Sequence, residues 1–249
     1  MKKNEYKKFW KKRSKNYEKL QWAIKSGYLH EFLKAGSFDA TDIVLDIGTG
    51  TGIVAHLVSG IVDSVTGIDI SGDMLSHAFD HRIDNERFLI GDARSLDFKK
   101  NTFSKVTARM VFHHILDSTQ EAMNECLRVL KRSGKMIFSE GVPPTQHVKD
   151  FYTEMFKLKE ERLTFMDEDL LCLMSNAGFV NIRKIIYRMP RVSVKNWLDN
   201  SGLNETNKAT ILKMHRELDE RGKRDYNMTL TKDDCLIDMK FVILVGQKP

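Results

Sequence analysis

The chain has 249 residues, of which 41% are hydrophobic and 30% charged, and this composition excludes a disordered or low-complexity protein. Lys and Arg exceed Asp and Glu by 6, a balance that first suggests nucleic acid, a membrane surface or an anionic ligand. However, residues 1–26 alone carry a net charge of +8, so the remaining chain is slightly acidic. The basic character therefore belongs to one short segment.

The sequence shows no sign of export or membrane insertion. Its three cysteines, Cys126, Cys172 and Cys235, are widely spaced, which argues against a disulfide framework or a zinc site and favours a reducing cytoplasm. No apolar run is long enough for a transmembrane helix. His77 and His81 stand four residues apart but lack a third ligand in the sequence. We therefore expect a cytoplasmic protein with no metal site.

The basic segment at residues 3–26 has apolar and aromatic residues at steps of three and four, which predicts an amphipathic helix. Tyr6, Phe9, Trp10 and Tyr17 form its aromatic stripe. Two interpretations stay open: the stripe covers a ligand pocket as a lid, or it is ordinary packing. A short second helix is predicted at residues 27–36.

Strands and helices then alternate every 20–25 residues as far as position 139, which predicts a parallel sheet with helices on both faces. The strands are apolar without polar alternation, as expected of strands covered on both sides. The predicted strands are Ile43–Ile47, Ser64–Ile70, Arg87–Ile90, Lys105–Val111 and Lys135–Ser139. The predicted helices cover residues 53–60, 71–81 and 118–130, the last with Gly134 as its stop signal.

The last part of the chain is more helical. Helices are expected at 145–163 and from Asp167 through Ala177, with Gly178 at the end of the second. Strands are expected at Asn181–Tyr187 and Lys240–Val245. The residues from about 191 to 235 thus form a helical insertion between two late strands, a place where chains often cover an active site.

The strongest chemical signal is the segment 44–52, where an apolar strand runs into Gly48, Gly50 and Gly52 and then into a helix. Glycines there permit positive φ and let a ligand approach the backbone, and the helix N-terminus offers free amide groups. Asp69 follows Gly48 by 21 residues, at the end of the next strand, where a carboxylate can bind ribose hydroxyls. This pattern indicates a nucleoside-containing cofactor. Ile53 stands where a dinucleotide fingerprint needs a third glycine, which argues against NAD.

With this loop in place, the sequence resembles the class I S-adenosylmethionine-dependent methyltransferases, especially the small-molecule group of ubiquinone and menaquinone biosynthesis. The resemblance covers about residues 40–140 and runs in order through five motifs. These are Asp46–Gly52, Gly67–Leu75, Gly91–Ala93 with Leu96, Phe103–Val106 leading to Val111–Ile115, and Leu127–Gly134 leading to Ile137–Phe138. Two positions depart from the family pattern: Lys105 replaces an Asp, and Lys131–Gly134 replaces a Lys-Pro-Gly-Gly turn.

The resemblance implies S-adenosylmethionine as the cofactor and assigns its contacts. Gly48 and Gly50 would pass beneath the methionine part, and Asp46 would lie near its amino group. Asp69 would hold the ribose diol. The other residues that the resemblance places around the cofactor are Tyr17, Thr49, Ile70, Met74 against adenine, Asp92 at the adenine amine, Ala93 beside the ring, Arg109 near the sulfonium or carboxylate, and His114.

His113 and His114 follow the fourth strand, where methyl donor and acceptor should meet. An imidazole there could take a proton from the acceptor. The alternative is that His114 only positions the cofactor. Basic and aromatic residues of the insertion could shape an acceptor pocket or simply be solvated; they are Trp197, Lys213, His215, Arg216, Arg221, Lys223, Arg224 and Tyr226.

The predicted architecture is a doubly wound, Rossmann-like α/β fold with a seven-stranded, mostly parallel sheet and helices on both faces. We divide it into a helical lid at 1–36, a cofactor domain at 37–190 and 236–249, and the insertion at 191–235 as part of the acceptor pocket. The predicted function is methyl transfer to the O, N or C atom of a small molecule, with an anionic acceptor as one option. The alternatives are an RNA nucleotide methyltransferase, which we do not favour, and a non-catalytic binding module. No membrane partner is expected, and the chain would be a monomer or a homodimer.

Overall fold

The computed structural model describes residues 26–249. Most of the predicted N-terminal helix, including Tyr17, lies outside the described residues. The first described helix is α3, Ser26–Gly36, close to the helix predicted at 27–36. Among residues 26–249, no helix combines the length and the apolar character needed to cross a membrane.

A single sheet organises the described chain, with strand order β3-β2-β1-β4-β5-β8-β6 and with β7 paired to β8. Strands β1 to β5 are mutually parallel, and β8 runs antiparallel to both β5 and β6. The strands are β1 Ile43–Ile47, β2 Ser64–Asp69, β3 Glu86–Ile90, β4 Phe103–Arg109, β5 Leu130–Val142, β6 Val180–Ser193, β7 Thr229–Leu230 and β8 Cys235–Gln247. The mixed α/β sheet is therefore as expected, and the strand count differs by the two-residue β7 inside the insertion.

Helices cover both faces of this sheet. Neighbouring residues of a strand point to opposite sides, so they pack against helices on different faces. Val44 belongs to a hydrophobic cluster that also holds residues of α3, α4 and α5. Leu45, the next residue, belongs to a second cluster shared with α6 and α8. The remaining helices are α4 Ile53–Ser59, α5 Gly72–Asp80, α6 Thr119–Val129, α7 Lys149–Lys157, α8 Asp167–Ala177, α9 Val194–Asp199, α10 Glu205–Arg216 and α11 Glu220–Asp225.

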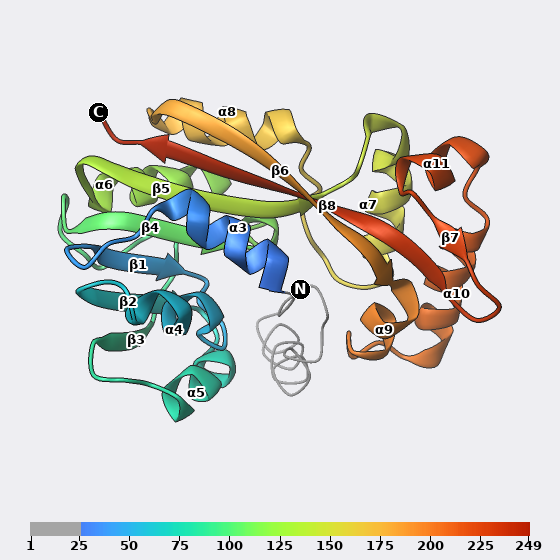
Figure 1. Ribbon diagram of the computed structural model, residues 1–249, viewed down its shortest axis with the longest axis horizontal. Helices are drawn as coiled ribbons and strands as arrows, with labels where there is room; N and C mark the ends of the chain where they lie inside the picture. The colour runs from blue at the N-terminus through green and yellow to red at the C-terminus, as the bar shows by residue number, and fades with distance from the viewer. Residues whose placement is uncertain (1–25) are drawn as a thin grey trace.

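The late strands β6 and β8 are much longer than predicted. Beyond the end of β5 they continue to pair with each other, as at Met189 with Met239 and Ser193 with Leu236. This twisted overhang carries α9, α10, α11 and β7, and α7 lies beside them on the right of Figure 1, while β1 to β4 lie on the left.

Three other predicted boundaries were wrong. The fourth strand ends at Arg109 and not at Val111, because Met110 takes a left-handed conformation with φ 60 and a 3-10 turn, Phe112–His114, follows. Gly134 lies inside β5, so α6 ends without it. The helix predicted at 145–163 is shorter, since a 3-10 turn precedes α7 and α7 ends at Lys157.

Candidate active site

A cavity opens at the carboxyl ends of β1, β2 and β4, where the strand order reverses between β1 and β4. Open α/β sheets bind their ligands at such a reversal. The cavity has a volume of about 330 Å³. It brings together all eleven described residues predicted to contact the cofactor: Asp46, Gly48, Thr49, Gly50, Asp69, Ile70, Met74, Asp92, Ala93, Arg109 and His114.

The glycine loop between β1 and α4 forms the floor of this cavity. Gly48 and Gly50 have φ of 60° and 59°, a left-handed conformation that favours glycine. A Cβ atom at Gly48 would lie 2.2 Å from Cγ2 of Val111, and one at Gly50 would lie 3.1 Å from Cε of Met74. Because Gly48 and Gly50 have no side chain, Val111 and Met74 pack closely against the loop and a ligand can approach its backbone from the cavity.

Asp69, at the end of β2, fixes the glycine loop in place. Its Oδ2 accepts a hydrogen bond from the Gly50 amide at 2.9 Å, and its Oδ1 accepts one from the Ser71 amide at 2.8 Å. Burial raises the pKa of this carboxyl, while the two amide donors act in the opposite direction. A carboxylate oxygen has two lone-pair sites, so further acceptor capacity remains toward the cavity.

Asp46, at the end of β1, is a buried carboxylate with only 2% of its surface exposed. Its Oδ1 accepts a hydrogen bond from the hydroxyl of Thr107 at 2.6 Å. Within residues 26–249, its Oδ2 has no hydrogen-bond donor in normal geometry. Burial raises the pKa of Asp46 to about 6. The buried carboxylate of Asp46 can therefore accept a hydrogen bond from a cationic group of a ligand in the cavity.

Asp92, after β3, lies at the far side of the cavity and is bound by Arg94. The guanidinium of Arg94 reaches Oδ2 of Asp92 at 2.7 Å and Oδ1 of Asp117 at 2.5 Å. Hydrogen bonds from Arg94 hold the pKa of Asp92 below its usual value, so the carboxylate is ionised at neutral pH. Arg94 and Asp117 both line the cavity, although the sequence analysis did not single them out.

The two predicted histidines occupy different places. His114 lines the cavity, whereas His113 is 1% exposed and lies behind it, with the two ring centroids 4.0 Å apart. Nδ1 of His113 pairs with Oε2 of Glu140 at 2.5 Å. Oε1 of Glu140 accepts hydrogen bonds from the amides of Val111 at 3.0 Å and Phe112 at 2.7 Å.

Glu140, in β5, thus fixes the turn that carries both histidines, and it is the main residue that the sequence analysis missed. Burial raises the pKa of Glu140 to about 7. The sequence feature that could have identified Glu140 is its position as an acidic residue near the carboxyl end of the apolar strand β5. Met110, Val111 and Ile53 also line the cavity without having been predicted to contact the cofactor.

The predicted acceptor residues of the insertion divide into two groups. Trp197, His215 and Tyr226 are buried and line a second, smaller cavity beside Gly141 and Val142 at the end of β5. The basic residues are exposed or partly exposed and do not line it; they are Lys213, Arg216, Arg221, Lys223 and Arg224.

Within residues 26–249, one group of side chains has the spacing of a metal site. His113, His114 and Glu160 each offer one ligand atom, and these atoms lie within 4.8 Å of one another. However, Nζ of Lys159 lies 2.7 Å from the carboxylate of Glu160, and Nη1 of Arg162 lies 3.7 Å from it. Two cations around one ligand disfavour a metal ion, and we assign none.

Comparison with known proteins agrees with this geometry. A family model described as a methyltransferase domain matches residues 45–138. A demethylmenaquinone methyltransferase of Staphylococcus aureus is 32% identical over 165 residues, which cover 56% of this chain and 68% of that protein. A demethylmenaquinone methyltransferase of Thermotoga maritima is 38% identical over 103 residues, but the match spans only 41% of this chain and 44% of that enzyme.

The similarity to a Bacillus subtilis protein extends over most of the chain. The uncharacterized methyltransferase YcgJ is 26% identical over 227 residues, covering 87% of this chain and 88% of YcgJ. The crystal structure of YcgJ matches with a TM-score of 0.80 at 24% identity, over 89% of this chain and 98% of that one, and so shares the fold. Family model, relatives and fold agree: this chain belongs to the class I S-adenosylmethionine-dependent methyltransferases and is an enzyme that uses S-adenosylmethionine as its cofactor.

Proposed function

We propose that this enzyme transfers the methyl group of S-adenosylmethionine to a small-molecule acceptor by in-line displacement, with the cofactor in the cavity at the β1/β4 reversal. One observation carries the proposal. A single cavity of about 330 Å³ joins a left-handed glycine loop, a carboxylate that anchors it and a histidine in the turn after β4. Pockets of this volume are typical of small-ligand sites.

The methionine end of the cofactor is assigned to the glycine loop. Gly48 and Gly50 present bare backbone, and Thr49 lies between them at the cavity wall. The buried Oδ2 of Asp46 suits the ammonium group, because a cation there would satisfy an acceptor that has no donor within residues 26–249. Arg109, at the end of β4, supplies a positive charge for the carboxylate.

The adenosine end is assigned to the ends of β2 and β3. Asp69 would accept hydrogen bonds from the ribose hydroxyls while it holds the Gly50 amide. Met74, which is buried, offers an apolar contact for adenine, and Ile70 lies exposed at the cavity wall. Asp92 and Ala93 lie where the adenine edge would end.

The protein's part in the reaction is alignment, exclusion of water and, where the acceptor must lose a proton, base catalysis. S-adenosylmethionine, when bound, supplies an electrophilic methyl group on a sulfonium. We assign the base to His114, because it lines the cavity. His113 is a positioning residue, since it is buried behind His114 and its ring is held by Glu140.

The acceptor is assigned to the space between this cavity and the insertion. We take the insertion as residues 191–235, a range that contains α9 to α11 and β7. We propose a cytoplasmic enzyme, with the N-terminal residues 1–36 as a lid. No described feature favours RNA as the acceptor over a small molecule, because the net positive charge is concentrated in the first 26 positions.

The proposal is tested by a screen with isotopically labelled S-adenosylmethionine against fractionated metabolite extracts. We expect label in one small-molecule fraction, and a rate at least tenfold lower for His114→Ala with unchanged affinity for S-adenosylhomocysteine. Label that appears only in RNA would contradict the small-molecule assignment. Equal rates for His114→Ala and wild type would remove the base role.

A further inference from the structure

Two ion pairs that share one arginine join two segments in the wall of the cavity at the β1/β4 reversal. Asp92 and Arg94 lie in the segment after β3, and Asp117 lies between the 3-10 turn Phe112–His114 and α6. All three residues line the cavity. Nη2 of Arg94 donates to Oδ2 of Asp92 at 2.7 Å, and its Nη1 donates to Oδ1 of Asp117 at 2.5 Å. Arg94 therefore connects the segment assigned to adenine with the segment that follows His114.

Arg94 holds both oxygens of the Asp92 carboxylate. Oδ1 accepts hydrogen bonds from the backbone amide of Arg94 at 2.9 Å and from its Nε at 3.0 Å. Oδ2 accepts from Nη2 at 2.7 Å, and Nε also lies 3.2 Å from it. A guanidinium that binds both oxygens of a carboxylate adds geometric specificity to the attraction of the charges. The orientation of the Asp92 carboxylate is therefore set by Arg94.

Asp117 holds the other side of the same guanidinium. Its side chain is 78% exposed, so its ion pair with Arg94 is screened by solvent and contributes little stability. Its effect is on geometry, because an arginine that is bound from two separate segments has fewer rotamers available than an arginine that is bound from one. Asp117 thus restricts the movement of the group that orients Asp92.

The contacts with Arg94 leave the Asp92 carboxylate room for one more donor. An ionised carboxylate has about four lone-pair sites and no proton to donate. In the described structure, two sites on Oδ1 and one on Oδ2 are used. Hydrogen bonds from Arg94 hold the pKa of Asp92 below its usual value, so at neutral pH the carboxyl does not become a donor. The remaining site can accept an N–H group and would repel an oxygen atom.

We propose that Arg94 makes the enzyme selective for the adenine base of its cofactor, by holding Asp92 as a fixed acceptor for the 6-amino group. Arg94 acts through Asp92 and is therefore a positioning residue. This inference rests on the proposed function, because it takes Asp92 as the partner of the adenine edge. A purine with oxygen at position 6 would place one acceptor against another. A purine with hydrogen there would leave the last site of Asp92 without a donor.

The test compares three ligands that differ at position 6 of the purine: S-adenosylhomocysteine, S-inosylhomocysteine with oxygen there, and the purine analogue with hydrogen there. Each is titrated calorimetrically into the full-length protein. We expect wild type to bind S-adenosylhomocysteine at least tenfold more tightly than either analogue, because a hydrogen bond to a charged acceptor is lost. Arg94→Met should reduce this preference to less than threefold and change the affinity for the 6-hydrogen analogue less than twofold. Arg94→Lys should keep an intermediate preference, since an ammonium group retains the charge but lacks the planar fork.

Arg87 provides the matched control, because it is an exposed arginine of β3 that does not line the cavity. Arg87→Met should leave the preference for S-adenosylhomocysteine unchanged. If Arg94→Met does not fold, Arg94→Lys takes its place and should lower the preference at least threefold. An unchanged preference in the Arg94 variants, an equal loss of affinity for all three ligands, or equal binding of the three by wild type would overturn the inference. Failure of wild type to bind S-adenosylhomocysteine would instead overturn the proposed function.

Discussion

At the scale of single residues, Asp46 shows how a binding site can cost stability. Its pKa in the folded protein is about 6, above the ordinary value of 3.8, so the folded state binds the proton more tightly than the unfolded state. The ionised carboxylate therefore destabilises the fold above pH 6, and this cost disappears as the pH falls below about 4.

We expect Asp46→Asn to raise the free energy of unfolding of the cofactor-free protein by up to about 3 kcal/mol at pH 7.5, and by much less near pH 4. The amide keeps an oxygen for the hydroxyl of Thr107, which now donates to Oδ1 at 2.6 Å. Urea denaturation at the two pH values measures the change. A loss of stability at both values would show that the charge of Asp46 is compensated in the folded state.

Asp69 combines two roles in one carboxylate, because it accepts the amides of Gly50 and Ser71 and faces the cavity. We expect Asp69→Ala to weaken S-adenosylhomocysteine binding more than tenfold in calorimetric titrations. Asp73→Ala is the matched control, since Asp73 is an exposed acid in the first turn of α5 and does not line the cavity. Similar affinities for the two variants would contradict the ribose assignment.

At the scale of elements, the glycine loop depends on backbone conformation at defined positions. Gly48 has a left-handed φ and a neighbour that a Cβ would overlap, whereas Gly60, the residue after α4, has φ −70 and open space. We expect Gly48→Ala to lower the free energy of unfolding by about 1–3 kcal/mol and to weaken cofactor binding. Gly60→Ala should change stability by less than about 0.5 kcal/mol. Equal effects in chemical denaturation would mean that the loop tolerates a side chain.

The core elements could be predicted from the sequence because their signals are local. Apolar strands such as Ile43–Ile47 and the Gly178 stop of α8 are recorded in short stretches of sequence. The eleven described residues that line the cavity at the β1/β4 reversal came from the resemblance in the same part of the sequence. By contrast, the ends of β4 and β6 depend on distant partners: Glu140 bends the chain after Arg109, and β8 extends the pairing of β6 to Ser193. No local pattern contains such pairings.

The charged residues that the fold buries were less predictable. Arg162 and Lys159 are ordinary charged residues in the sequence, and only the fold buries them beside the aromatic rings of Phe156 and Trp197. Glu140 is likewise fixed only by its contacts with the turn at Val111–His113. Periodicity does not report the tertiary burial of single charges.

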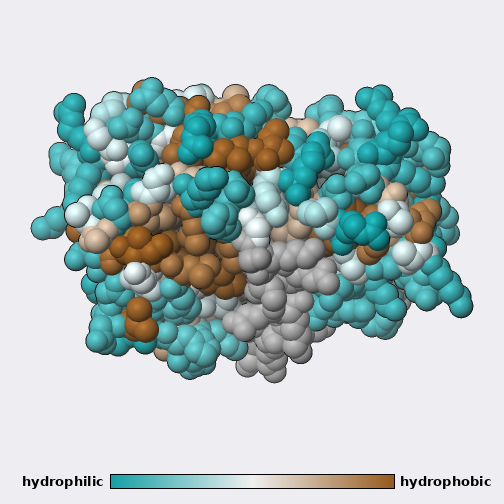
Figure 2. All heavy atoms as spheres, in the orientation of Figure 1, coloured by the Kyte–Doolittle hydropathy of each residue, from teal (hydrophilic) through white to brown (hydrophobic). Residues whose placement is uncertain are grey.

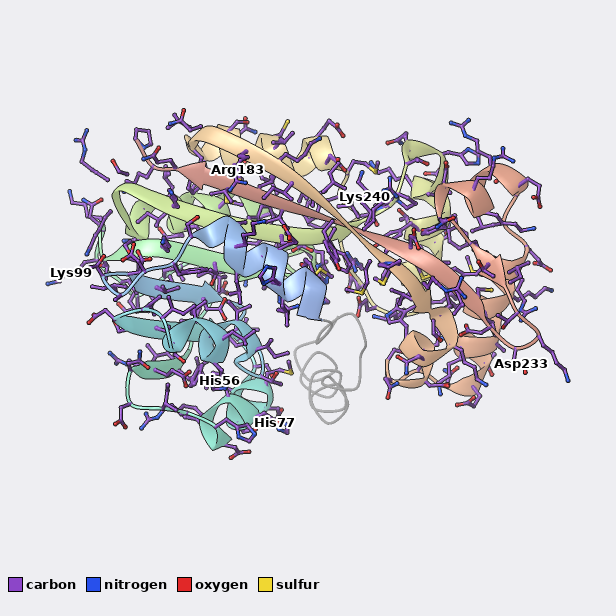
Figure 3. All side chains as sticks on the ribbon, in the orientation of Figure 1. His56, His77, Lys99, Arg183, Asp233 and Lys240 are labelled. Atoms are coloured by element: carbon purple, nitrogen blue, oxygen red, sulfur yellow. The ribbon has the colours of Figure 1, made fainter. Side chains whose placement is uncertain are left out.

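At the scale of the whole molecule, one hydrophobic cluster joins the insertion to the sheet. It runs from Val54 of α4 through Phe241 of β8 to Trp197 and Ile211. Lys240 lies near the crossing of β6 and β8 in Figure 3 and pairs with Asp167 at 2.6 Å, inside the same region. Hydrophobic side chains also reach the surface over α3 and α4 (Figure 2). The insertion and the sheet therefore share a continuous hydrophobic core and do not meet at a polar interface.

We accordingly expect one cooperative unfolding transition in calorimetry, although the chain contains an inserted helical segment. Ile211→Ala, in α10, removes a fully buried side chain and should lower the stability of the whole protein by about 2–5 kcal/mol. Leu230→Ala, at a half-exposed position of β7, is the control and should have a smaller effect. Two separate transitions, of which Ile211→Ala shifts only one, would show that the insertion unfolds on its own.

The central claim is that the cavity at the β1/β4 reversal holds S-adenosylmethionine. The most direct measurement is a crystal structure of the protein with S-adenosylhomocysteine. We predict that its amino-acid end lies on Gly48 and Gly50 beside Asp46, with its ribose hydroxyls on Asp69 and its adenine between Met74 and Asp92. An empty cavity at saturating ligand, or ligand bound elsewhere on the chain, would contradict the account.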